Sequence, residues 1–130
     1  MFLPMPVWES RAQESFNGLV KWIYSDVPND WLNWSIKNRA LWWSDPTIRE
    51  TFIKLGLTRK RDRISTVEVW CEFYGYSSVN YTQRYARSLN KLLGSIPTLE
   101  RVKGRIRCGP YGLQRGFKVH HPDEQHSERL

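Results

Sequence analysis

Cysteine is scarce in this chain of 130 residues, which contains only Cys71 and Cys108. Two cysteines are too few for a disulfide scaffold, and their spacing is not that of metal ligands. The sequence also lacks any run of about 18 apolar residues, so we expect no membrane-spanning helix. Its first ten residues lack the basic and apolar regions of a secretory signal. These absences together predict a cytoplasmic protein in a reducing compartment.

Patterns typical of catalysis are also missing. No nucleophile is accompanied by a base and an orienting group, so we expect neither an enzyme nor a bound cofactor. Residues 120–130 are polar and predict a flexible tail, in which the spacing of potential ligands is not that of a metal site. The potential ligands are His120, His121, Asp123, Glu124 and His126. Glu68 and Glu72 form a carboxylate pair on one face of an expected helix, where Cys71 is expected in the core.

Acidic residues are few in the second half of the chain. Residues 51–118 contain fourteen Lys/Arg and four Asp/Glu, whereas residues 1–50 contain five Lys/Arg and six Asp/Glu. The net charge of +7 therefore originates in the segment 51–118. This asymmetry favours a polyanionic partner, most often nucleic acid, over a basic surface that serves only solubility.

Six of the seven tryptophans precede residue 44 and accompany helical patterns. Apolar spacing predicts one helix over residues 9–24 and a second over 30–40. Asp45, followed by Pro46, predicts the start of a third helix that stops at Gly56. We expect residues 1–57 to form an aromatic-rich helical part. Its tryptophans are expected to pack in the core rather than to form a stacking platform for single-stranded nucleic acid; they are Trp31, Trp34, Trp42 and Trp43.

The basic half begins with a connector over residues 59–63. Ser65 and Glu68 have the spacing of a capping box and predict a fourth helix. After a polar turn, Asn80 is expected to cap a fifth helix over about 81–93.

The pattern changes to alternation after Pro97. Arg105 and Arg107 alternate with apolar residues, and Arg115, Phe117 and Val119 are expected on one side of a return strand. Residues 109–113 form a dense turn signal between the two segments. The sequence therefore predicts a β-hairpin.

Two helices joined by a short turn and followed by a hairpin have the order of a winged helix-turn-helix. The predicted fold is α+β and mostly helical, with a winged-helix domain over residues 64–119 that packs with residues 1–57 as one unit. In this architecture the second helix of the pair enters the major groove of DNA, and the hairpin, or wing, supplies further contacts. The expected nucleic-acid-binding residues are Gln83, Arg84, Arg87, Asn90 and Lys91 on the fifth helix, and Lys103, Arg105, Arg107, Tyr111, Arg115 and Lys118 on the wing. Tyr111, at the hairpin tip, has two alternatives: contact with nucleic acid, by insertion into a groove or by stacking on a base, or folding back on the hairpin.

Residues 64–119 resemble the C-terminal region of the virulence-associated protein E family, the primase/helicase-like replication proteins of prophages and mobile elements. The matching residues are VWCE at 69–72, the leucine-bearing helix ending at Leu93, and above all GPYGLQRGF at 109–117. ALWWSDP at 40–46, with Phe52 and the Leu-Gly-Leu of 55–57, is similar to the preceding segment, so that the likeness spans roughly residues 28–119. The resemblance implies a role in DNA replication of a mobile element.

The motor of that family needs a phosphate-binding loop ending in Lys-Ser/Thr, which is absent from this sequence. We therefore expect no ATP hydrolysis. Two functions remain: a DNA-binding module that acts on a duplex or a replication fork, and a protein-interaction module. The second would dock on a replication helicase or primase or on a host protein, and includes a phage-encoded inhibitor of a host enzyme.

Overall fold

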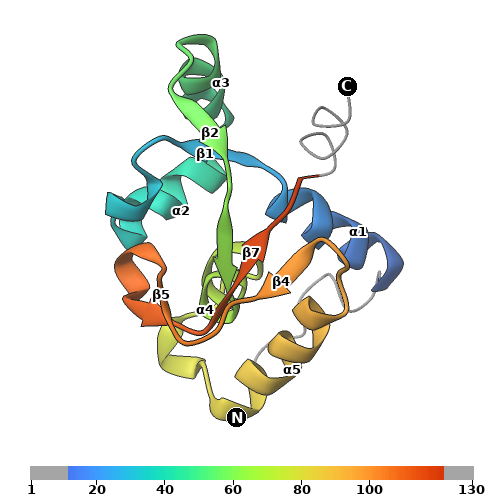
Figure 1. Ribbon diagram of the computed structural model, residues 1–130. Coiled ribbons are helices and arrows are strands. Elements are labelled where there is room, and N and C mark those ends of the chain that lie inside the picture. Colours follow the sequence, from blue (N-terminus) through green and yellow to red (C-terminus); the bar gives the residue numbers. More distant parts are fainter. Residues whose placement is uncertain (1–11, 122–130) are drawn as a thin grey trace, which may run out of the picture.

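The computed structural model describes residues 12–121, with side chains described from Phe16 onward (Figure 1). Within these residues the fold is mixed α/β and about half helical, with five α-helices and small antiparallel sheets. The predicted helix start at residue 9 lies outside this range. So does most of the predicted tail, including Asp123, Glu124 and His126.

The first half of the chain forms three helices and a two-stranded ribbon. Its elements are α1 (Ala12–Ile23), β1 (Asp26–Pro28), the 3-10 helix η2 (Trp31–Asn33), α2 (Ile36–Ser44), α3 (Pro46–Lys54) and β2 (Thr58–Lys60). The predicted third helix is confirmed: the Asp45 carboxylate accepts from the Thr47 amide, and Gly56, at φ 69°, follows the helix. In Figure 1, α3 and β2 project at the end of the molecule opposite α5.

Two predictions for this half are wrong. The helix expected over 30–40 is divided, because Trp34 is extended and the Ser35 hydroxyl accepts from the Asn38 amide, which starts α2 at Ile36. The basic connector contains strand residues: β2 pairs antiparallel with β1, and β3 (Arg63–Ser65) starts the second sheet.

The second half contains the larger sheet, in the order β3-β7-β4. β4 is Leu99–Arg101 and β7 is Gly116–Val119, and β7 pairs antiparallel with both neighbours. Between them, β5 (Ile106–Arg107) pairs with β6 (Leu113–Gln114) around the 3-10 turn η5 (Gly109–Tyr111). The hairpin and its turn are confirmed. The expected alternation fails at Arg115, which interrupts the strand between β6 and β7 and is exposed, whereas Phe117 and Val119 are buried.

The helices of this half begin at the predicted capping box, in which Ser65 and Glu68 cap each other's backbone. α4 (Thr66–Glu68) continues directly into the π-helix η3 (Val69–Phe73). The 3-10 helix η4 (Ser78–Asn80) then leads to α5 (Gln83–Gly94). The expected Asn80 cap is wrong, because the Thr82 side chain accepts from the Tyr85 amide and starts the helix two residues later.

Two apolar clusters hold these elements together. The larger joins α1, the η3 segment, α5 and the sheet, with Ile64, Val69, Leu93 and Phe117 among its buried members. The smaller contains Trp31 and Trp42, with Trp34, Trp43 and Phe52 packed against them. The prediction that these tryptophans belong to the core is therefore confirmed. Within residues 12–121, no helix is both long and apolar enough to cross a membrane.

Candidate nucleic-acid interface and a buried charge network

The solvent face of α5 carries four of the five residues of this helix that were predicted to contact DNA. Gln83, Arg84, Arg87 and Lys91 are exposed, whereas Leu89 and Leu93 on the opposite face are buried. This division follows from helical periodicity, because apolar residues four apart face the sheet and leave the cations outside.

Asn90, the remaining predicted residue of this helix, is half-buried and already bound. Arg101 Nη1 donates to Asn90 Oδ1 at 2.6 Å, and Arg101 Nη2 donates to the Asn90 carbonyl at 3.2 Å. The Arg101 guanidinium also lies 5.0 Å from the centre of the Phe117 ring. Sequence reasoning missed Arg101, which fixes β4 to α5. A basic residue on the strand after the helix was the only available signal.

The hairpin exposes the predicted cations Lys103, Arg105, Arg107, Arg115 and Lys118. Ile106 is half-buried and Cys108 is buried, so the predicted faces of this strand are confirmed. Arg107 Nη2 donates to Asn33 Oδ1 at 3.0 Å, which ties this side chain to the first half of the chain. Lys118 lies in register between Arg63 and Glu100 on neighbouring strands.

Tyr111 does not fold back on its own hairpin as one alternative predicted, because its side chain reaches from the hairpin tip to Glu72 of η3 and lies near Arg39 of α2. Its hydroxyl donates to Glu72 Oε2 at 2.8 Å. The adjacent turn is also close to the first half: a Cβ on Gly109, which has φ 68°, would lie 2.3 Å from Arg39 Nη2. Glycine is therefore needed there for both backbone conformation and space.

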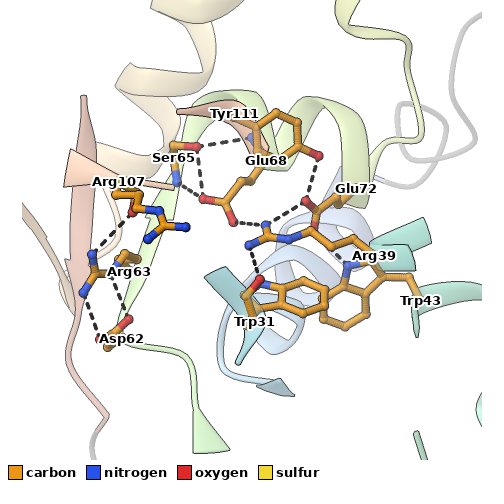
Figure 2. A network of polar contacts seen from close by, with 10 residues as sticks. All are labelled: Trp31, Arg39, Trp43, Asp62, Arg63, Ser65, Glu68, Glu72, Arg107 and Tyr111. Atoms are coloured by element: carbon orange, nitrogen blue, oxygen red, sulfur yellow. Dashed lines mark hydrogen bonds and ion pairs between the residues drawn. The ribbon is translucent and has the colours of Figure 1, made fainter. Parts of the chain in front are cut away.

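Arg39 lies at the centre of a buried polar network (Figure 2). Its Nη1 is 3.0 Å from Glu68 Oε2 and 3.1 Å from Glu72 Oε2, and its Nη2 donates to the Trp31 carbonyl at 2.9 Å. The Trp43 indole donates to Glu72 Oε1 at 2.9 Å. The Ser65 amide and hydroxyl both donate to Glu68 Oε1 at 3.1 Å. This network joins α2, the α4–η3 segment and the hairpin tip.

Burial affects the pKa of groups in and beside this network. It raises the pKa of Glu68, with a further contribution from the Glu72 charge, against the opposing effect of the arginines. Burial likewise raises the pKa of the Cys71 thiol to about 11, so the thiol is protonated at neutral pH and is a poor nucleophile. Arg39 binds both carboxylates, Ser65 also donates to Glu68, and Trp43 and Tyr111 also donate to Glu72, so the arrangement is typical of a structural network.

Arg61 is a second buried arginine with different surroundings. Arg61 is 2% exposed. Its guanidinium carbon lies 4.2 Å from the centre of the Trp22 ring and 5.3 Å from the centre of the Trp43 ring. None of its three guanidinium nitrogens has a hydrogen-bond partner among the described residues. Burial lowers the pKa of Arg61. Sequence reasoning missed both buried arginines, because their partners come from elements far along the chain.

A pocket of about 420 Å³ opens beside Glu72 and Tyr111, between α2 and the turn that precedes α5. Within residues 12–121, no group of three or more His, Cys, Asp or Glu side chains is placed to hold a metal ion.

Comparison with known proteins adds no relative, since neither a family model nor a curated protein matches the chain.

Proposed function

We propose that the chain is a DNA-binding winged-helix module of a mobile-element replication protein. The observation that carries this proposal is the solvent face of α5, on which Gln83, Arg84, Arg87 and Lys91 are exposed together. Glutamine and arginine are side chains that read base edges, and lysine suits phosphate.

The order of elements supports the winged-helix assignment. β3 precedes the α4–η3 segment, a short turn leads to α5, and β4 and β7 follow as the arms of the hairpin. The central position of β7 between β3 and β4 makes one compact antiparallel sheet behind α5. The replication role rests on the residues that resemble the virulence-associated protein E family, above all those at 109–117.

We expect the wing to position the protein on the DNA backbone rather than to recognise the base sequence. Its tip is held by the bond between Tyr111 and Glu72, so minor-groove insertion of Tyr111 would require that bond to break. Lys103, Arg105 and Arg115 are exposed along the flanks and suit contacts with the phosphate backbone.

Binding of a fluorescent duplex, measured by anisotropy at two salt concentrations, tests this function. We expect strong salt dependence, and Arg84→Ala and Arg87→Ala should each weaken binding by about 1–3 kcal/mol if they read bases. Lys54→Ala is the matched control, because this exposed cation lies on α3 at the opposite end of the molecule (Figure 1). Folded Arg84 and Arg87 variants that bind like the wild type would overturn the proposal.

A second candidate function, docking on another protein, is favoured by one observation. At the end of α3 and just beyond it, Ile53 is 55% exposed, Leu55 is 65% exposed and Leu57 is 43% exposed. Grouped exposed apolar side chains are typical of interaction surfaces. Ile53→Ser with Leu55→Ser separates the two functions, since it should leave duplex binding unchanged and weaken only a protein contact.

A further inference from the structure

The pocket beside Glu72 has the chemistry of a site for a flat aromatic group. Its volume of about 420 Å³ lies in the range of small-ligand sites. The aromatic residues Trp43, Tyr76 and Tyr111 line it, and the small residue Ala40 lines it at the α2 side. Aromatic side chains that line a pocket favour ligands that stack.

Glu72 is the acidic residue among those that line this pocket, and its side chain is 4% exposed. Its carboxylate accepts from Arg39, Trp43 and Tyr111, which hold it in one orientation. A carboxylate has about four acceptor positions, so three bonds leave one for a ligand donor. Exocyclic amino groups of nucleobases are donors of this kind, and glutamate accepts from them in base recognition.

The pocket is connected to the α5 face by a short stretch of chain. Ser77 and Ser78 line it, and four residues further on Thr82 caps the helix that carries Arg84 and Arg87. A nucleic-acid strand bound to the start of α5 would therefore pass close to the pocket.

We propose that this pocket accepts one unpaired, amino-bearing base, so that the preferred ligand is DNA with a single-stranded junction, such as a fork, rather than an uninterrupted duplex. This inference rests on the proposed DNA-binding function and names the DNA structure that the same surface would prefer. The unstacked base would lie among the aromatic rings and donate its amino group to Glu72.

The experiment compares a labelled duplex with a forked duplex of the same sequence that carries 2-aminopurine, an amino-bearing base, at its first unpaired position. Anisotropy measures affinity, and 2-aminopurine fluorescence reports the stacking of that base. We expect the wild type to bind the fork about tenfold more tightly, because stacking of one base is worth about 1–3 kcal/mol, and the fluorescence to change on binding.

Ala40→Phe should fill the pocket and abolish the fork preference, with duplex affinity unchanged. Ser78 is an exposed residue that lines the pocket on the side opposite Ala40, and Ser78→Phe should also fill the pocket. This second variant serves as the test if Ala40→Phe folds poorly. Asn38→Phe is the control, because Asn38 is exposed on the same helix but does not line the pocket.

The outcomes separate the two proposals. Equal affinity for fork and duplex, or a preference that survives both pocket-filling variants, overturns the base pocket. If duplex binding remains sensitive to Arg84→Ala in that case, the proposed function stands. Failure to bind either DNA overturns both.

Discussion

Arg39 and Arg61 are both buried, yet the chain compensates their charges in different ways. Arg39, with 0% exposure, meets two carboxylates and a backbone carbonyl. Arg61, at 2%, has two indole rings and no hydrogen-bond partner among the described residues. Both guanidiniums lie 4.2 Å from the centre of a tryptophan ring, Trp31 for Arg39 and Trp22 for Arg61, but of the two only Arg39 also makes hydrogen bonds to carboxylates.

The difference follows from which elements each arginine joins. Arg39, on α2, reaches η3 through Glu72 and thereby the hairpin tip through Tyr111. Arg61, between β2 and β3, brings together Trp22 of α1 and Trp43 of α2. The two sites meet at Trp43, whose ring lies near Arg61 and whose indole N–H binds Glu72. One buried unit thus joins the two halves of the described chain.

The largest expected effect is that of Arg39→Met. This change leaves Glu68 and Glu72 buried without their ion-pair partner, and loss of one member of a buried pair costs about 3–5 kcal/mol. Arg39→Lys, which retains the charge, should cost less. The free energy of unfolding from urea titration measures both, with the exposed Lys37→Met on the same helix as control. A loss below about 1 kcal/mol would contradict the central role of Arg39.

At Arg61 we expect the opposite ranking of the stability losses, with the lysine variant less stable than the methionine variant. Arg61→Met should cost about 1–2 kcal/mol, because the lost ring contacts are partly offset by removal of a buried cation without hydrogen bonds. Arg61→Lys should cost more, since an ammonium is more strongly hydrated than a guanidinium and stacks less well. Urea titration again gives the values, with Arg59→Met, which removes a half-exposed ion pair to Asp62, as control. If lysine is tolerated better than methionine, Arg61 is held by charge and not by the rings.

Features that depend on residues close together in the sequence could be predicted, and features that depend on distant residues could not. The capping box at Ser65, the Asp45-Pro46 helix start and the hairpin turn were predictable because each depends on residues a few positions apart. The ribbon of β1 and β2 was not, since two three-residue strands pair across about thirty residues of chain and show no alternation. Neither buried arginine was predictable for the same reason: Glu68 and Glu72 lie far along the chain from Arg39, and burial of a cation depends on tertiary partners.

Tyr111→Phe is the mildest test of the Arg39 site. Glu72 would lose one donor and retain Arg39 and Trp43, so we expect a loss of about 1 kcal/mol near neutral pH. Burial, with the Glu72 charge beside it, raises the pKa of Tyr111 above its ordinary value of 10.0. Above pH 10 the unfolded tyrosine therefore releases a proton that the folded one retains, and the stability from this group falls as pH rises.

The advantage of the wild type over Tyr111→Phe should consequently shrink above pH 10, whereas other tyrosines contribute equally to both proteins and cancel. Urea titrations at pH 7 and at several alkaline values measure the difference. Tyr85→Phe controls for the loss of a hydroxyl, because Tyr85 is exposed and its ring would stay stacked on Trp70 at 4.5 Å. An unchanged difference between Tyr111→Phe and the wild type across this pH range would show that the hydroxyl of Tyr111 is not held by Glu72.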